Sequence, residues 1–155
     1  MNGKLEIAAE IRRLMRAERA YLGSLADRSG GLFPFVSLVA PALDAGNLPI
    51  LLLSDLSDHV RNLKRAPKAS LMFDGSMGLK EPLTGPRVTL LGEVTQSSEP
   101  EIRRRYLAQR PEAGLYAGFG DFRFYLFRPE EALYVAGFGK IHRLAGEDLA
   151  SALGQ

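Results

Sequence analysis

The apolar positions near the start of the chain recur with the spacing of a helix. Within residues 4–20 they fall three or four positions apart, at Ile7, Ile11, Leu14 and Met15. Several arginines occupy other positions of the same helical wheel. The pattern predicts an amphipathic helix whose arginines form a solvated face.

Shorter apolar runs, separated by turn residues, follow this helix. They predict strands over residues 21–26, 35–40 and 50–54. The segment DAGN at 44–47 is predicted to be a hairpin turn, because Gly and Asn tolerate a positive φ. The first third of the chain is therefore predicted to be mainly strand.

The rest of the chain mixes helices with longer strands. The strands are predicted over 70–73, 87–96, 122–129 and 131–139. Helices are predicted over 58–65 and 99–109, the second capped by Ser98. Gly92 interrupts an alternating strand pattern, which predicts a β-bulge or a close backbone approach. Residues 140–155 are predicted to be weakly structured or to form a short terminal helix.

Strands dominate this pattern, and nothing in it repeats the strand–helix–strand rhythm of a parallel sheet. Short strands with frequent turn signals predict an antiparallel sheet closed into a small barrel. The fold class is therefore mainly β (α+β), an antiparallel barrel with flanking helices. Residues 1–155 show no repeat and no boundary, so we predict a single domain.

Composition narrows the classes of function. Twenty Lys and Arg face eighteen Asp and Glu, for a formal net charge of +2. This near balance argues against nucleic-acid binding, which usually concentrates basic residues on one stripe. No apolar run approaches the roughly 20 residues of a membrane-spanning helix, and we expect no membrane contact. The lack of cysteine and of a secretory apolar segment predicts a cytoplasmic protein.

A polar stretch after the apolar run Leu51–Leu53 raises the question of a binding site. If a helix begins near Ser57 or Asp58, its first turn presents unpaired backbone N–H groups, which bind anions readily. Ser54, His59 and Arg61 would add donors for a phosphate. The local alternative is a surface helix that Ser57 or Asp58 simply caps, with Arg61 in solvent.

The order of four segments resembles a known family. They are FPFVSLVAPALD, LLLSDLSDHVRNLKRAPKASLMF, GPRVTLLGEV and GDFRFYLFRPEEALYVAGFGKIH. Together, over residues 10–145, they resemble the flavin-binding split barrels related to pyridoxamine 5′-phosphate oxidase. The last segment is most similar to the branch that includes haem-utilisation proteins. The resemblance implies a split β-barrel that forms a homodimer, with FMN at the subunit interface.

The resemblance also implies the residues that would bind FMN. The phosphate and ribityl contacts would be Ser54, His59, Arg61 and Asn62, with Arg87 as a further cation. The residues along the flavin ring, mostly through backbone groups, would be Ser37, Leu38 and Val39. The residues that close the site from the partner subunit would be Phe138 and Gly139.

The chain departs from the oxidase itself at its C-terminal segment. The segment GFGKIHRLAGEDLASALGQ lacks the arginine- and histidine-bearing pattern that grips the oxidase substrate. We therefore expect no vitamin B6 oxidation, but an FMN-dependent reductase or oxidase that acts on an unidentified small molecule. One alternative is a haem-binding or haem-utilisation protein, with His142 as the iron ligand. Another is a flavin-binding module without turnover.

The residues supply no nucleophile motif and no cluster of metal ligands. The chain has two histidines and no cysteine, so a zinc site is not expected. A flavoprotein needs neither feature, because the cofactor carries the electron chemistry and the protein supplies position and electrostatics.

Overall fold

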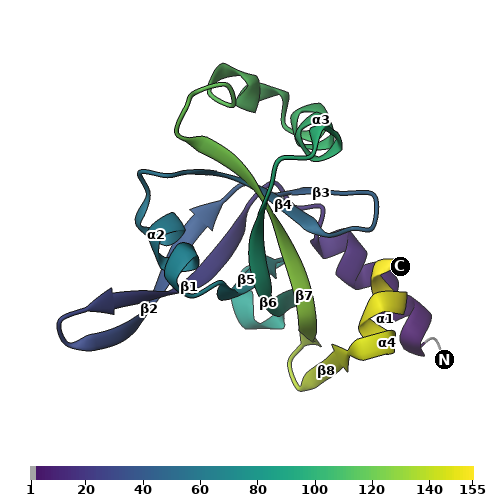
Figure 1. Cartoon of the computed structure of the whole chain (residues 1–155). Coiled ribbons are helices and arrows are strands. Elements are labelled where there is room, and N and C mark those ends of the chain that lie inside the picture. The colour runs from purple at the N-terminus through teal and green to yellow at the C-terminus, as the bar shows by residue number, and fades with distance from the viewer. Residues whose placement is uncertain (1–2) are drawn as a thin grey trace.

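An eight-stranded antiparallel sheet forms the centre of the computed structural model, which describes residues 3–155 (Figure 1). Its strands are β1 (Ala20–Arg28), β2 (Gly31–Val39), β3 (Ala42–Leu43), β4 (Pro49–Ser54), β5 (Lys68–Asp74), β6 (Arg87–Ser97), β7 (Phe122–Gly137) and β8 (Lys140–Ala145). Their order across the sheet is β2-β1-β5-β6-β7-β4-β3, and β8 pairs with β7 beside that path. The predicted antiparallel split barrel is confirmed, but the sheet is open because β2 and β3 end its path.

Four α-helices flank the sheet in the described part of the chain. They are α1 (Gly3–Leu14), α2 (Asp58–Arg65), α3 (Pro100–Gln109) and α4 (Gly146–Leu153). The helices α1 and α4 pack together beside the sheet, whereas α3 lies at another end of the molecule (Figure 1). Short 3-10 helices η1 (Pro82–Thr84) and η2 (Pro111–Leu115) lie in the connections. Within residues 3–155, no helix has both the length and the hydropathy needed to cross a bilayer.

The strand β7 is continuous where two strands were predicted. We expected a break near Pro129, which lacks a backbone donor, but β7 passes through this point. There Gly92 of β6 pairs with Pro129, while Leu91 pairs with Glu131, so Glu130 is an extra residue on β7. The bulge predicted at Gly92 is thus confirmed. It lets one long strand continue past the proline.

Three local predictions also need correction. The first helix ends at Leu14, because the chain must enter β1 at Ala20. The helix α3 begins after Glu99, which makes no side-chain capping bond, so the predicted cap at Ser98 is wrong. Residues 140–145 form β8 before the terminal helix α4. The predicted turn at 44–47 is present, with Asn47 at φ 64°, but it joins β3 to β4.

The strand β4 lies between two apolar clusters, which explains its uninterrupted apolar sequence. Leu51 and Leu53 belong to the larger cluster, which α1, α4 and the inner face of the sheet share. Ile50 and Leu52 point the other way, into a smaller cluster beneath α3. A strand buried on both faces shows no alternation of polar and apolar residues. Ser54, the last residue of β4, therefore follows directly after Leu52 and Leu53, which belong to the two different clusters.

Candidate functional site

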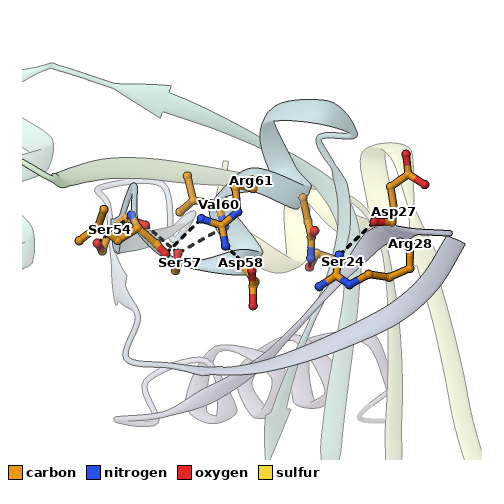
Figure 2. Close-up of polar contacts among 10 residues, drawn as sticks. Ser24, Asp27, Arg28, Ser54, Ser57, Asp58, Val60 and Arg61 are labelled. Atoms are coloured by element: carbon orange, nitrogen blue, oxygen red, sulfur yellow. Dashed lines mark hydrogen bonds and ion pairs between the residues drawn. The ribbon is translucent and has the colours of Figure 1, made fainter.

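The polar residues after β4 form a capping network. Ser57 is the N-cap of α2: its hydroxyl oxygen accepts from the Val60 N–H at 3.4 Å and its O–H donates to the Ser54 carbonyl at 2.7 Å (Figure 2). The Ser54 hydroxyl donates to Asp121 at 2.6 Å and accepts from the Leu56 N–H at 3.1 Å. The structure thus shows the capped helix, and these two hydroxyl groups already have partners within the protein.

Charged residues at this corner are also paired. The Arg61 guanidinium contacts the Asp58 carboxylate and donates to the Leu56 carbonyl at 3.3 Å (Figure 2). The carboxylate of Asp55 lies 3.5 Å from Arg123, and Asp121 accepts the bond from Ser54. Several carboxylates therefore surround the start of α2. Lys64 also lies 3.6 Å from Asp55, so the cations that a phosphate dianion would need at this corner are already paired with the protein's own carboxylates.

His59 faces a cavity of about 320 Å³ beside this corner. The walls include Leu38, Val39 and Leu52 from the sheet, together with three aromatic side chains, Tyr106, Tyr116 and Phe122. Burial lowers the pKa of His59, and the nearby Asp58 charge offsets only part of this effect. At neutral pH the imidazole is therefore uncharged, the form that binds a metal.

The hydroxyl of Tyr106 is fixed at the wall of this cavity. It donates to the Ala40 carbonyl at 2.6 Å. Burial raises the pKa of Tyr106 well above its ordinary value, so the phenol stays protonated. The ring also packs edge-on against Phe124, 5.5 Å between centroids. The Tyr106 side chain is thus held in place at this wall, and it presents an uncharged ring to the cavity.

The structure brings together only some of the predicted FMN ligands. The residues that line the cavity are Leu38, Val39, Ser54 and His59. Asn62 is buried, and its side-chain amide donates to the Ser24 hydroxyl at 3.0 Å, which ties α2 to β1. The Ser37 hydroxyl is buried and has no hydrogen-bond partner within residues 3–155. A role in binding FMN stays a prediction for each of these residues.

The remaining predicted residues lie at the far end of β7. Ser54 pairs with Phe122, whereas Arg87 pairs with Val135, thirteen residues further along β7. That separation is about 40 Å along the strand. Arg87 donates to two carbonyl groups, of Leu83 and Gly85, each at 3.0 Å, and so holds the loop before β6.

The turn between β7 and β8 belongs to this same far end. Phe138 is 73% exposed there, and Gly139 has a φ of 75°. His142 on β8 is exposed, with its ring centroid 6.0 Å from that of Tyr134. Within one subunit, therefore, Phe138 and Gly139 cannot close the His59 cavity. The predicted site would need these residues from a second subunit.

Three comparisons with known proteins identify the relatives of this chain. Residues 4–150 match the family model described as CREG, beta-barrel. The chloroplastic heme oxygenase HOZ of Arabidopsis thaliana is 36% identical over 118 residues, which are 74% of this chain and 36% of that protein. Heme oxygenase HutZ of Vibrio cholerae is 27% identical over 157 residues, covering 96% of this chain and 86% of HutZ.

A solved structure, of a heme binding protein from Mycobacterium smegmatis, superimposes with a TM-score of 0.81 at 28% identity. The match covers 96% of this chain and 60% of that one. This chain thus spans about a third of the Arabidopsis relative and under two thirds of the mycobacterial one. The predicted resemblance to split barrels of the pyridoxamine 5′-phosphate oxidase type, in their haem-utilisation branch, is confirmed. The chain belongs to the CREG beta-barrel family.

Proposed function

We propose that this protein binds haem in the cavity beside His59, with the His59 imidazole as the iron ligand. The observation that carries the proposal is the chemistry of this cavity: one uncharged histidine on a wall that is otherwise aliphatic and aromatic, apart from the Ser54 and Ser57 hydroxyls, which are already bonded within the protein. A porphyrin has large apolar faces and an iron that histidine binds well. The names of the Arabidopsis, Vibrio and Mycobacterium relatives support the same ligand.

A second candidate ligand for the same cavity is FMN, with the protein as an oxidoreductase or a non-catalytic flavin carrier. One observation favours it: the buried Ser37 hydroxyl has no partner among the described residues, and it lies on β2 beside Leu38, a residue that lines the cavity and that the resemblance places along the flavin ring. A ring nitrogen or carbonyl could satisfy that hydroxyl. Against FMN stand the donors at the start of α2, where its phosphate would have to lie: Arg61 and the Ser54 and Ser57 hydroxyls are already bonded to protein groups.

A visible spectrum separates the two ligands. We expect haemin added to the purified protein to give a Soret band that saturates at one haem per chain. We expect added FMN to pass through an ultrafiltration membrane that retains the protein. A retained yellow flavin with no Soret shift would reverse the assignment. Decay of the Soret band with ascorbate in air would extend the proposal from haem binding to haem breakdown, the activity that the names of two relatives state.

We propose that a second copy of the chain covers the outer face of β2. The side chains of Leu32, Val36 and Leu38 on this face are 58%, 70% and 64% exposed. They belong to the last strand of the sheet path, and an apolar face of this kind marks an interaction surface. Leu38 also lines the His59 cavity, so the second copy would add a wall to the proposed haem site.

A charge placed on this face tests the dimer. Val36→Glu is expected to convert the protein from dimer to monomer in sedimentation velocity, because a carboxylate would have to be desolvated within the interface. The side chain points outward, so the monomer should keep its fold by circular dichroism. Leu5→Glu is the matched control, since Leu5 is 85% exposed on α1, which lies across the molecule from β2 (Figure 1). Wild-type protein that sediments as a monomer would refute the dimer.

The pH dependence of haem binding should report His59. Because burial lowers its pKa below the ordinary 6.5, the imidazole stays uncharged as pH falls through 6.5. Haem affinity is therefore expected to hold at that pH and to fall only in more acidic buffer. The same shift means that the contribution of His59 to folding is full above 6.5 and is lost as pH falls. A midpoint for haem release at or above 6.5 would contradict this assignment.

A further inference from the structure

A second cavity, of about 420 Å³, lies where the end of α1, the β3–β4 turn and the end of α3 meet. It shares no lining residue with the His59 cavity. Figure 1 shows β3 between α3 on one side and α1 with α4 on the other. Three arginines line this space, Arg16 from the end of α1 and Arg105 and Arg110 from α3 and its C-cap. We infer that this arginine cavity binds a small organic anion with two or more negative charges, carried by phosphate or carboxylate groups.

The charges around the arginine cavity are unbalanced. In residues 3–155, no carboxylate lies within 4.0 Å of the guanidinium groups of Arg16, Arg105 or Arg110. The acid that lines the cavity is Asp44, whose Oδ1 accepts from the N–H groups of Gly46 and Leu48 at 2.9 and 2.8 Å. Asp44 is thus committed to its own turn, and the excess of positive charge is left for a ligand.

The arginine cavity is also held in shape before any ligand arrives. Arg110 donates through Nη2 to the Ala17 carbonyl at 3.1 Å, which joins the end of α3 to the end of α1. The Gln109 side chain accepts from the Leu43 N–H at 2.9 Å and donates to the Leu43 carbonyl at 2.8 Å, as a neighbouring strand would. Walls fixed in this way lower the cost of ordering a bound ligand.

One donor in this arrangement lacks a partner. The Nε of Arg110 is buried without a hydrogen bond among the described residues, although both of its Nη atoms donate to carbonyl groups. A buried donor left unpaired costs about 1–3 kcal/mol, so its presence calls for an explanation. An oxyanion in the cavity would pair with this donor, and guanidinium forks match the oxygen spacing of carboxylate and phosphate groups.

The size of the cavity limits the ligand class. A volume of about 420 Å³ holds on the order of ten water molecules, far more than a single halide needs. The three arginines and Asp44 together leave two positive charges in excess, so a ligand that balances them carries at least two negative charges. A small organic phosphate or a di- or tricarboxylate meets both requirements.

Isothermal titration calorimetry at constant ionic strength tests the inference, with pyrophosphate and citrate as separate probes. We expect one of them to bind at one site per chain. The affinity should fall at least tenfold in Arg105→Gln and in Arg16→Gln. The Arg16 side chain is exposed and makes no hydrogen bond within residues 3–155, and its backbone bond to the Arg13 carbonyl would remain, so its variant is not expected to disturb the fold. Which probe binds distinguishes phosphate from carboxylate chemistry.

Arg104→Gln is the matched control. Arg104 lies on α3 beside Arg105, but it is exposed and paired with Glu101. The substitution removes the same charge from a residue that does not line the arginine cavity, so it should leave the affinity for the probe unchanged. Failure of both probes to bind, or an equal loss in Arg104→Gln, would overturn the inference. Haem binding to the same variants is expected to be unaltered, so failure of the proposed haem site would be seen separately.

Discussion

Replacing His59 with alanine is expected to lower haem affinity at least about tenfold, which corresponds to about 1.4 kcal/mol. The apolar and aromatic walls of the cavity would remain, so some haem would still bind. The iron, however, would lose its protein ligand, and the Soret band should shift and broaden. Titration with haemin, followed by absorbance, measures both effects. The substitution lies in the first turn of α2 and leaves the Ser57 cap in place, so the fold should survive.

His142→Ala is the natural control, because the chain has two histidines and no cysteine. His142 lines a different crevice of about 280 Å³, between α1, α4 and β8, whose apolar residues include Ile7, Ala8 and Leu144. Arg12 at the same crevice could pair with a propionate. If His142→Ala reproduced the loss and His59→Ala did not, haem would belong in this crevice and the proposed cavity would be wrong.

Much of the local structure can be predicted from the chain because short-range physics sets it. The predicted helix over 58–65 coincides with α2, since Ser57 offers a capping hydroxyl and Pro67 prevents continuation. Ile11, Leu14 and Met15 are buried as their spacing requires. The Gly92 bulge likewise follows from a glycine within an alternating pattern.

The candidate site could be predicted only in part, because its walls come from distant segments. His59 and Leu38 lie in segments that the family resemblance marks. Phe122 lies in such a segment too, but Tyr106 and Tyr116 lie outside them, 47 and 57 positions beyond His59. Nothing local distinguishes an aromatic residue that lines a cavity from one in the core. The segment YAGFGDFRFYLF is rich in aromatic residues, but its sequence does not show which of them line a cavity.

The electrostatics of the corner after β4 were harder to predict from the sequence than the cavity walls. A sequence shows that Ser54, Arg61 and a helix start occur together, which favours an anion site. It does not show that Asp121 lies close enough to accept a hydrogen bond from the Ser54 hydroxyl, or that Arg61 pairs with Asp58. The pairing of β4 with the start of β7 brings that aspartate in. Long-range strand pairing therefore decided the chemistry of this corner.

Gly92→Ala is expected to destabilise the protein by about 3 kcal/mol, at the upper end of the usual cost of overpacking. An added Cβ would lie 2.2 Å from the Arg128 carbonyl oxygen and 2.8 Å from the Phe127 ring. The first of these atoms is backbone within the β6–β7 ladder, so it cannot turn aside as a flexible side chain can. To avoid these contacts, β6 would have to move away from β7 or pair with it without the bulge.

Thermal unfolding measures this cost, and for a chain of this length about 3 kcal/mol corresponds to a drop in Tm of about 6–12 °C. Gly114→Ala is the matched control, because a Cβ at Gly114 would have no neighbour within 4 Å. At such an open site alanine only restricts the unfolded chain, so Tm should stay level or rise slightly. A Gly92→Ala protein as stable as Gly114→Ala would mean that β6 and β7 are not held as closely at the bulge as this packing requires, and that β7 does not depend on Gly92 to pass Pro129.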